Sequence, residues 1–439
     1  MRLTPSLIDH AERLLAELLD SPFAADAVVS RYFRRQRELG ARERGVLADT
    51  AYAALRRRRS LSARCLGAAT PRRLALAAMA CALGANLREL EPAIGRAEAV
   101  WLAEAKALRL DALSPGERLD LPDWLYETLA GRLGAEETGA LARALNQPAP
   151  LDLRVNTLKA GRDEALSALR ESGVEAEACR HSPAGVRVLG KRSLIRHPLF
   201  LDGRIEVQDE GSQLLGYLLQ PKRGEMVADF CAGAGGKTLH LGALMASRGR
   251  LYAFDVSRER LARLKPRLAR SGLSNVYPAC IASERDARLR RLAGKLDRVL
   301  VDAPCSGLGT LRRNPDLKWR HSPESVAELA VKQAAILDAA AELVKPGGRL
   351  VYATCSLLAE ENDAVADAFF AGHPDFAPVS AGDTLAAQGI EIDIGERLRL
   401  SPQKHGTDGF FAVVMERRPA APGGKAREAS QPSGAESSS

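Results

Sequence analysis

Residues 227–238 have the sequence Val-Ala-Asp-Phe-Cys-Ala-Gly-Ala-Gly-Gly-Lys-Thr. The apolar beginning is typical of a buried strand, and the glycines after it let the backbone turn sharply and approach a ligand closely. The chain then continues into a run with Leu241 and Leu244 on the apolar face of a predicted helix. A strand, a glycine-rich turn and a helix in this order indicate an α/β fold that binds a nucleotide or a nucleoside.

Two kinds of ligand fit this turn. Gly236-Lys237-Thr238 ends it as a phosphate-binding P-loop ends, but that loop needs a glycine five positions before Gly236, where this chain has Cys231. The mismatch disfavours a nucleoside triphosphatase. Asp255 follows the glycines by about 20 residues, where an acidic side chain can accept hydrogen bonds from both ribose hydroxyls of an adenosine. A dinucleotide would fit the same spacing, and Asp255 could instead only cap the helix that begins near Ser257.

Strand candidates alternate with helical stretches through the second half of the chain. They lie at residues 226–230, 251–255, 276–280, 298–302 and 349–354, with a further one at residues 410–416. Alternation of this kind predicts a mostly parallel sheet wrapped by helices, as in Rossmann-like folds.

The chain before this sheet divides into two parts. Residues 3–145 are rich in Ala and Leu with apolar positions three and four apart, which predicts an all-α region. Pro148 and Pro150 interrupt that pattern, and short strand and helix candidates at residues 151–156, 162–172 and 185–189 predict a small α+β connector. We therefore predict a helical domain over residues 1–146, a connector over residues 147–208, a Rossmann-like domain over residues 209–418 and a disordered tail over residues 419–439.

Composition limits the class of protein. With 439 residues, 46% of them hydrophobic, the chain can bury more than one core, and its formal charge of +8 suits a polyanionic partner. The densest basic run, Arg56 to Arg59, fits that partner but is equally typical of a solvated helix face. Seven cysteines without a CxxC pair or clustered histidines predict neither disulfides nor a metal site. The stretch Leu74 to Leu87 is too short for a membrane span and the N-terminus lacks a signal pattern, so we expect a cytoplasmic protein.

Two cysteines follow neighbouring strand candidates. Residues 302–307, Asp-Ala-Pro-Cys-Ser-Gly, end the fourth strand, and residues 353–356, Ala-Thr-Cys-Ser, end the fifth. If these strands are neighbours in the sheet, their axes lie about 4.8 Å apart, and Cys305 and Cys355 can face one substrate. The paired placement sets them apart from Cys65, Cys81, Cys179 and Cys280, which we interpret as small buried hydrophobic residues.

This pair suits the methylation of carbon 5 of cytosine. That carbon is too weak a nucleophile to attack a methylsulfonium group until a nucleophile has been added at carbon 6, and a thiolate is suited to this addition. A carboxyl group near ring nitrogen 3, for which Asp302 is the candidate, would stabilise the adduct. A second thiol could then help to remove the proton from carbon 5.

Several motifs resemble those of a known family. They are residues 154–159, 208–212, 231–237, 302–307, 314–319, 354–356 and 405–411. Together they resemble the RsmB/Sun/Nop family of RNA cytosine-5 methyltransferases, over most of residues 151–416. The resemblance implies that Cys355 is the covalent nucleophile, that Cys305 helps to release the product and that S-adenosylmethionine is the cofactor, with no metal.

The resemblance also implies a set of cofactor-binding residues: Cys231, Ala232, Gly233, Ala234, Gly235, Gly236, Lys237, Asp255, Glu284 and Asp302. Glu284 stands where the family usually has an aspartate near the adenine, and Asp286 is close enough to compete for that place. Lys237 could hold the methionine carboxylate, reach an RNA phosphate or only be solvated at the start of a helix.

The helical N-terminal region resembles the NusB-like RNA-binding domain of the bacterial RsmB branch, whose substrate is small-subunit ribosomal RNA. The resemblance implies methylation of a cytosine in 16S ribosomal RNA. We expect a monomer, and the basic side chains of Arg34, Arg35 and Arg56 to Arg59 are the candidate phosphate contacts of this region. This region could instead be only a scaffold.

Two other functions remain open. One is a catalytically inactive RNA-binding factor for ribosome assembly. The other is a cytosine-5 methyltransferase with Cys305 as nucleophile, since DNA cytosine-5 methyltransferases use the thiol of the Pro-Cys motif.

Overall fold

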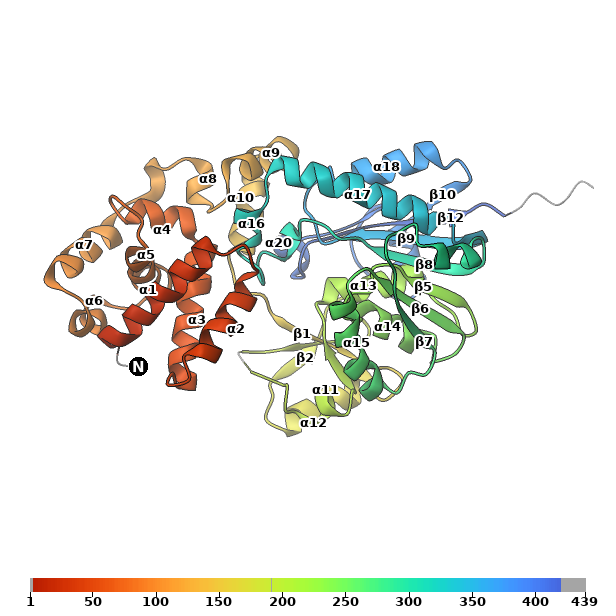
Figure 1. Cartoon of the computed structure of the whole chain (residues 1–439), viewed down its shortest axis with the longest axis horizontal. Coiled ribbons are helices and arrows are strands. Elements are labelled where there is room, and N and C mark those ends of the chain that lie inside the picture. Colours follow the sequence, from red (N-terminus) through yellow and green to blue (C-terminus); the bar gives the residue numbers. More distant parts are fainter. Residues whose placement is uncertain (1–2, 191, 420–439) are drawn as a thin grey trace, which may run out of the picture.

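The computed structural model describes residues 3–190 and 192–419 of the chain. Figure 1 shows a helical N-terminal part, a small sheet with two helices and a large sheet covered by helices on both faces. Residues 420–439 of the expected tail lie outside the described residues. Among the described helices, none combines the length and the apolar character needed to cross a bilayer.

The N-terminal part is helical, as the periodicity predicts. Thr4 accepts a hydrogen bond from the backbone N–H of Leu7 and thereby caps the first helix, in which proline takes the first position. The α-helices are α1 (Pro5–Asp20), α2 (Ala25–Arg35), α3 (Ala41–Arg56), α4 (Arg58–Arg64), α5 (Pro71–Ala77), α6 (Leu87–Leu90), α7 (Arg96–Ala107), α8 (Pro115–Arg118), α9 (Asp123–Leu133) and α10 (Ala135–Leu145). Short turns η1 (Ala78–Ala82), η2 (Glu91–Ala93) and η3 (Leu110–Ala112) join some of them.

These helices do not share one core. Buried side chains between residues 3 and 105, from α1 to α7, form one apolar cluster. The apolar faces of α9 and α10 instead pack against four residues of the large-sheet part: Leu308, Leu311, Val326 and Leu358. By its packing, the segment from Leu121 to Leu145 is therefore joined to the large sheet.

The small sheet has the strand order β2-β3-β1-β4, with antiparallel pairing throughout. Its elements are β1 (Leu151–Val155), α11 (Arg162–Glu171), β2 (Ala176–Ala178), β3 (Gly185–Val188), α12 (Pro198–Leu201) and β4 (Ile205–Val207). A separate apolar cluster, with Leu153, Leu169 and Val186 at its centre, holds α11 against the sheet. This part corresponds to the predicted α+β connector.

The large sheet has the strand order β10-β12-β9-β8-β5-β6-β7, and β11 pairs with β12. The strands are β5 (Met226–Asp229), β6 (Arg250–Asp255), β7 (Val276–Cys280), β8 (Leu296–Asp302), β9 (Val344–Thr354), β10 (Phe376–Val379), β11 (Leu398–Leu400) and β12 (Phe410–Arg417). Strands β5 to β9 are parallel, and the remaining pairs are antiparallel. This is the Rossmann-like sheet that the alternating pattern predicts.

Helices cover both faces of this sheet (Figure 1), with α13, α14 and α15 on one face and α17 and α18 on the other. The helical segments are α13 (Glu210–Leu219), α14 (Gly236–Leu244), α15 (Arg258–Ser271), η4 (Ala287–Leu292), η5 (Leu308–Thr310), α16 (Leu317–Arg320), α17 (Pro323–Ala341), α18 (Asp363–Gly372), α19 (Ala381–Ala386) and α20 (Pro402–His405). The chain moves outward from β5 to β6 and β7, then returns to the other side of β5 with β8 and β9. Ligands of open α/β sheets bind at such a reversal of strand order, beyond the carboxyl ends of the strands.

The segment from Asn314 to Arg320 fastens the N-terminal helices to the large-sheet part. Lys318 Nζ donates to the carbonyl of Arg56 and Trp319 Nε1 to that of Leu55, each at 2.7 Å. Arg320 donates to the carbonyl of Pro22 at 2.7 Å. The motif at residues 314–319 is therefore an attachment between two parts of the fold.

The basic run from Arg56 to Arg59 takes part in the same attachment, and its side chains are all at least half-buried. Arg56 donates to the carbonyl of Arg312 (3.0 Å), Arg58 lies over the Trp319 ring, and Arg59 pairs with Asp123. These internal partners disfavour Arg56 and Arg59 as phosphate contacts. Their guanidinium groups are held by internal partners, whereas Arg34 and Arg35 are exposed.

Candidate active site

A cavity of about 530 Å³ lies at the carboxyl ends of β5, β6 and β8, where the strand order reverses. Predicted site residues that line it are Cys231, Ala232, Gly233, Ala234, Asp255, Glu284, Asp302, Cys305 and Cys355. Other lining residues include Val256, Arg260 and Lys332. Gly235, Gly236 and Lys237 do not line it and form the start of α14 behind it. The volume suits a ligand of nucleoside size.

The glycine-rich turn is shaped by two positive φ angles, 56° at Gly233 and 84° at Gly235. A Cβ atom on Gly235 would lie 2.1 Å from Cδ1 of Leu264, so any other residue there would also force the Leu264 side chain to shift. The turn thus brings its backbone to the cavity wall. Behind it, the buried Arg154 of the connector donates to the carbonyl of Gly236 at 2.6 Å, a link that no pattern in the sequence indicates.

Asp255 organises this turn and faces the cavity. Its Oδ2 accepts the backbone N–H of Gly233 (2.8 Å), and its Oδ1 accepts that of Ser257 (2.7 Å). The cap of α15 is Ser257 itself, whose hydroxyl accepts the N–H of Arg260 at 3.2 Å. The helix therefore does not need Asp255 as its cap, and Asp255 lies on the cavity wall.

Glu284 and Asp286 take different places. Glu284 lines the cavity. Asp286 accepts the backbone N–H of Ala282 (2.8 Å) and pairs with Arg288, and the Arg288 guanidinium holds the pKa of this carboxyl below its usual range. Asp286 is therefore used to cap η4, and of these two acidic side chains Glu284 is the one that lines the cavity.

The two thiols meet at the ends of adjacent strands. β8 and β9 pair in parallel with Asp302 opposite Ala353, and Sγ of Cys305 lies 3.4 Å from Sγ of Cys355. The hydrogen bond between them raises the pKa of Cys305 well above its ordinary value, and burial and the nearby carboxylates of Glu361 and Asp302 act in the same direction. The Cys305 thiol is therefore held in its protonated form, directly beside the sulfur of Cys355.

Lys237 pairs with Asp302 at 2.7 Å and lies 5.6 Å from the centre of the Phe410 ring. Burial alone would lower the pKa of Lys237, but the Asp302 carboxylate outweighs that effect and raises it. Lys237 is thus charged and fixes Asp302 beside the thiols, and it is not simply solvated at the start of a helix. A lysine directly after a glycine-rich turn could have suggested a charge partner, but the sequence did not show which carboxylate would meet it.

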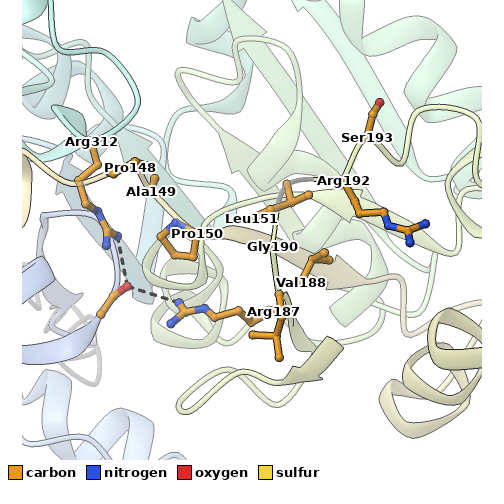
Figure 2. Close-up of a pocket in the computed structure, with 12 residues that line it drawn as sticks. Pro148, Ala149, Pro150, Leu151, Arg187, Val188, Gly190, Arg192, Ser193 and Arg312 are labelled. Atoms are coloured by element: carbon orange, nitrogen blue, oxygen red, sulfur yellow. Dashed lines mark hydrogen bonds between the residues drawn. The ribbon is translucent and has the colours of Figure 1, made fainter. Parts of the chain in front are cut away.

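A second cavity, of about 870 Å³, lies between the connector and the large-sheet part. Figure 2 shows Arg187 and Arg312 on its wall, both directed at one oxygen. This oxygen is the carbonyl of Gly406, 3.4 Å from Arg187 and 3.2 Å from Arg312. Arg187 also pairs with Asp152, and Arg312 also pairs with Asp408. These contacts therefore mainly join the connector to the large-sheet part.

The site has the features that S-adenosylmethionine requires: a glycine turn that lets the backbone approach, an acidic side chain at the end of β6 and a second one, Glu284, further along the wall. Thiols at the ends of the next two strands lie beside the same cavity. Fold and site together define a Rossmann-like methyltransferase.

Comparisons with known proteins give the family. The family of 16S rRNA methyltransferases RsmB/F matches residues 216–416, and the RsmF/B-like ferredoxin-like domain matches residues 121–194. Ribosomal RNA small subunit methyltransferase B of Sodalis glossinidius is 37% identical over 307 residues, which cover 69% of this chain and 68% of the relative. The chain therefore belongs to the RsmB/F family of rRNA methyltransferases, and its cofactor is S-adenosylmethionine.

Solved structures agree with this fold. The crystal structure of PH0851 aligns with a TM-score of 0.76 at 29% identity and covers 95% of this chain and 100% of its own. A methyltransferase homolog protein from Pyrococcus horikoshii aligns with a TM-score of 0.60 at 31% identity and covers 71% of this chain and 100% of its own. The resemblance inferred from the sequence motifs is confirmed.

Proposed function

We propose that this enzyme transfers a methyl group from S-adenosylmethionine to carbon 5 of a cytosine in 16S ribosomal RNA, through a covalent bond between Cys355 and carbon 6. The observation that carries the proposal is the thiol pair: the two sulfurs lie 3.4 Å apart at the ends of adjacent strands, on the wall of a cavity that Asp302 also lines. A redox or structural cysteine pair would not need a carboxylate and a nucleoside cavity beside it, and this pair has both.

In the proposed reaction, the thiolate of Cys355 adds to carbon 6 of the cytosine. Asp302, held by Lys237, faces the same cavity and is the group proposed to hydrogen-bond near ring nitrogen 3 and stabilise the adduct. S-adenosylmethionine supplies the methyl group that carbon 5 accepts. A solvent water positioned by the Cys305 thiol then takes the carbon-5 proton. The electron pair of that C–H bond forms the double bond between carbons 5 and 6 again, while the bond between Cys355 and carbon 6 breaks and the Cys355 thiolate returns.

The test compares the wild-type protein with Cys355→Ala and Cys305→Ala, using labelled S-adenosylmethionine and unmethylated 16S ribosomal RNA. Covalent protein–RNA adducts are resolved on a denaturing gel and 5-methylcytosine is measured by mass. We expect Cys305→Ala to accumulate an adduct and Cys355→Ala to give neither adduct nor product. Cys81→Ala is the matched control, since Cys81 belongs to the N-terminal helices.

Other outcomes would favour other functions. If Cys305→Ala cannot form an adduct, Cys305 is the nucleophile and the roles of the thiols are reversed. If the wild-type protein binds this RNA but does not methylate it, a catalytically inactive assembly factor is favoured. Methylation at another atom, or of another RNA, would contradict the proposed target.

We also propose that the helical domain, residues 1–146, binds RNA while the enzyme acts as a monomer. Arg34 and Arg35 are exposed on α2, although Arg35 also pairs with Glu17 at 2.5 Å. Neutralising both should reduce the slope of log affinity against log salt by up to about two, because each phosphate contact releases roughly one counterion. An unchanged slope would contradict RNA contact by this helix.

A further inference from the structure

Glu361 is a fully buried carboxylate in the segment between β9 and α18, with 0% of its surface exposed. Burying a charged carboxylate is unfavourable unless hydrogen-bond donors replace the lost water. The donors that surround Glu361 are neutral: a backbone N–H, two serine hydroxyls and a glutamine amide. A carboxyl group buried and hydrogen-bonded in this way, next to two thiols, calls for a function.

The carboxylate joins the two segments that carry the thiols. Oε1 of Glu361 accepts the backbone N–H of Ser306 at 2.8 Å, and Oε2 accepts its hydroxyl at 2.5 Å. Oε2 also accepts the hydroxyl of Ser356. Ser306 directly follows Cys305, and Ser356 directly follows Cys355. One side chain thus bridges the residues next to both sulfurs, and the two hydroxyls lie 3.1 Å apart.

A second layer of hydrogen bonds holds this bridge. Gln333 of α17 donates from its amide to Oε1 of Glu361 (2.9 Å) and to the carbonyl of Pro304 (3.0 Å), the residue before Cys305. Tyr352 donates to the carbonyl of Glu361 at 2.5 Å. Asn362 accepts the hydroxyl of Thr354 and donates to the carbonyl of Ser356 at 3.1 Å. The residues on both sides of each cysteine are therefore fixed to one buried network.

We propose that Glu361 is a positioning residue that locks the Cys305 and Cys355 segments into one unit and so sets the distance between the two sulfurs. The expected effect of Glu361 on turnover rests on the proposed function, whereas its effect on the distance between the two sulfurs does not. The hydrogen bond with Cys355 and burial are the main causes that raise the pKa of Cys305, and Glu361 adds to them, so the side chain that holds the segments together also favours the protonated form of that thiol. Glu361 has no contact with substrate in this scheme and acts through the cysteines.

The first test measures sulfur proximity without any RNA. Dibromobimane alkylates two neighbouring thiols with loss of two bromide ions and becomes fluorescent when it bridges them. Wild-type protein should bridge Cys305 to Cys355, and Cys305→Ala should remove that signal. Glu361→Ala should bridge several times more slowly, because the buried donors of Ser306 and Ser356 lose their acceptor.

Conservative variants separate position from simple stability. Glu361→Gln can keep the oxygen acceptor and donate from its amide to hydroxyls that rotate, so it should bridge nearly as fast as the wild type. Glu360→Ala is the matched control, because Glu360 is exposed at the neighbouring position. If Glu361→Ala does not fold, the double variant Ser306→Ala/Ser356→Ala removes the same link with small changes and should also bridge slowly. Bridging at the wild-type rate in Glu361→Ala, or in that double variant, would overturn the proposal.

The second test uses turnover. Glu361→Ala should lower kcat by about 100-fold, the effect expected when reacting groups are misplaced by roughly 1 Å, while KM for S-adenosylmethionine stays unchanged. Glu361→Gln should recover most of kcat. If the wild-type protein bridges as expected but methylates no RNA, the proposed function fails and the positioning role stands. If turnover falls equally in both Glu361 variants while bridging is normal, the positioning role fails and the proposed function stands.

Discussion

Gly309 gives the sharpest quantitative test of how Cys355, the proposed nucleophile, is held. Its backbone N–H donates to the carbonyl of Cys355, and its own carbonyl accepts the N–H of Gly409, both at 2.8 Å. A Cβ atom added to Gly309 would lie 2.2 Å from the oxygen of Gly409 and 2.8 Å from that of Cys355, whereas ordinary contact begins at 3.4 Å. Both neighbours are backbone atoms and cannot rotate away. Gly309→Ala must therefore move the Cys355 segment, the Gly409 segment or both by several tenths of an ångström to more than one ångström.

We expect two measurable effects of Gly309→Ala. Overpacking should reduce the free energy of unfolding by about 1–3 kcal/mol. Displacement of Cys355 should lower kcat by up to about 100-fold, while affinity for S-adenosylmethionine, measured by calorimetry, should not change because the cofactor turn is elsewhere. Gly131→Ala in α9 is the control, since a Cβ there has no neighbour within 4 Å. A Gly309→Ala protein with wild-type kcat and normal adduct formation would refute the view that this backbone contact fixes Cys355.

Two further predictions concern charge. Burial lowers the pKa of Lys318 from 10.5 to about 7, so between these pH values the unfolded chain binds a proton that the folded chain does not, and stability must rise with pH. The free energy of unfolding should thus increase between pH 7 and 9 by up to about 2–3 kcal/mol. In Lys318→Met, urea titrations should show a smaller increase of this free energy with pH. The same increase in both proteins would contradict the lowered pKa of Lys318. For the cofactor, Glu284→Gln should weaken S-adenosylmethionine binding by roughly tenfold or more, as expected for loss of a charged hydrogen bond, and Asp286→Asn should leave calorimetric affinity nearly unchanged. A larger loss in Asp286→Asn would reverse that assignment.

Much of the catalytic half could be predicted because its determinants are local. The predicted strands at residues 226–230, 251–255 and 276–280 match β5, β6 and β7 to within one residue, since apolar runs bounded by turns specify strands directly. The conditional expectation that the fourth and fifth strands are neighbours is confirmed by the pairing of β8 with β9. The thiols meet because parallel neighbours end at the same edge of the sheet.

Long-range partners could not be predicted in this way. Periodicity shows that α9 and α10 have an apolar face, but it does not show which core that face joins. The sequence of the basic run from Arg56 to Arg59 is typical of a solvated or RNA-binding surface. Its hydrogen-bond acceptors, such as the carbonyl of Arg312, are distant in the chain and could not be identified from the sequence. Glu361 stands between Glu360 and Asn362, and nothing in that short acidic stretch distinguishes the buried carboxylate from its exposed neighbour.

The packing of α9 and α10 bears on how this chain can be shortened or recombined. A cut at the prolines, before residue 147, would leave the apolar surface around Leu308, Leu311, Val326 and Leu358 open to water. A cut between Ala107 and Leu121 would keep that surface covered and remove helices whose core is separate. A shortened chain that keeps the core of the large-sheet part covered therefore begins before α9, well ahead of the first strand. Helices α1 to α7 could be replaced without exposing that core to water.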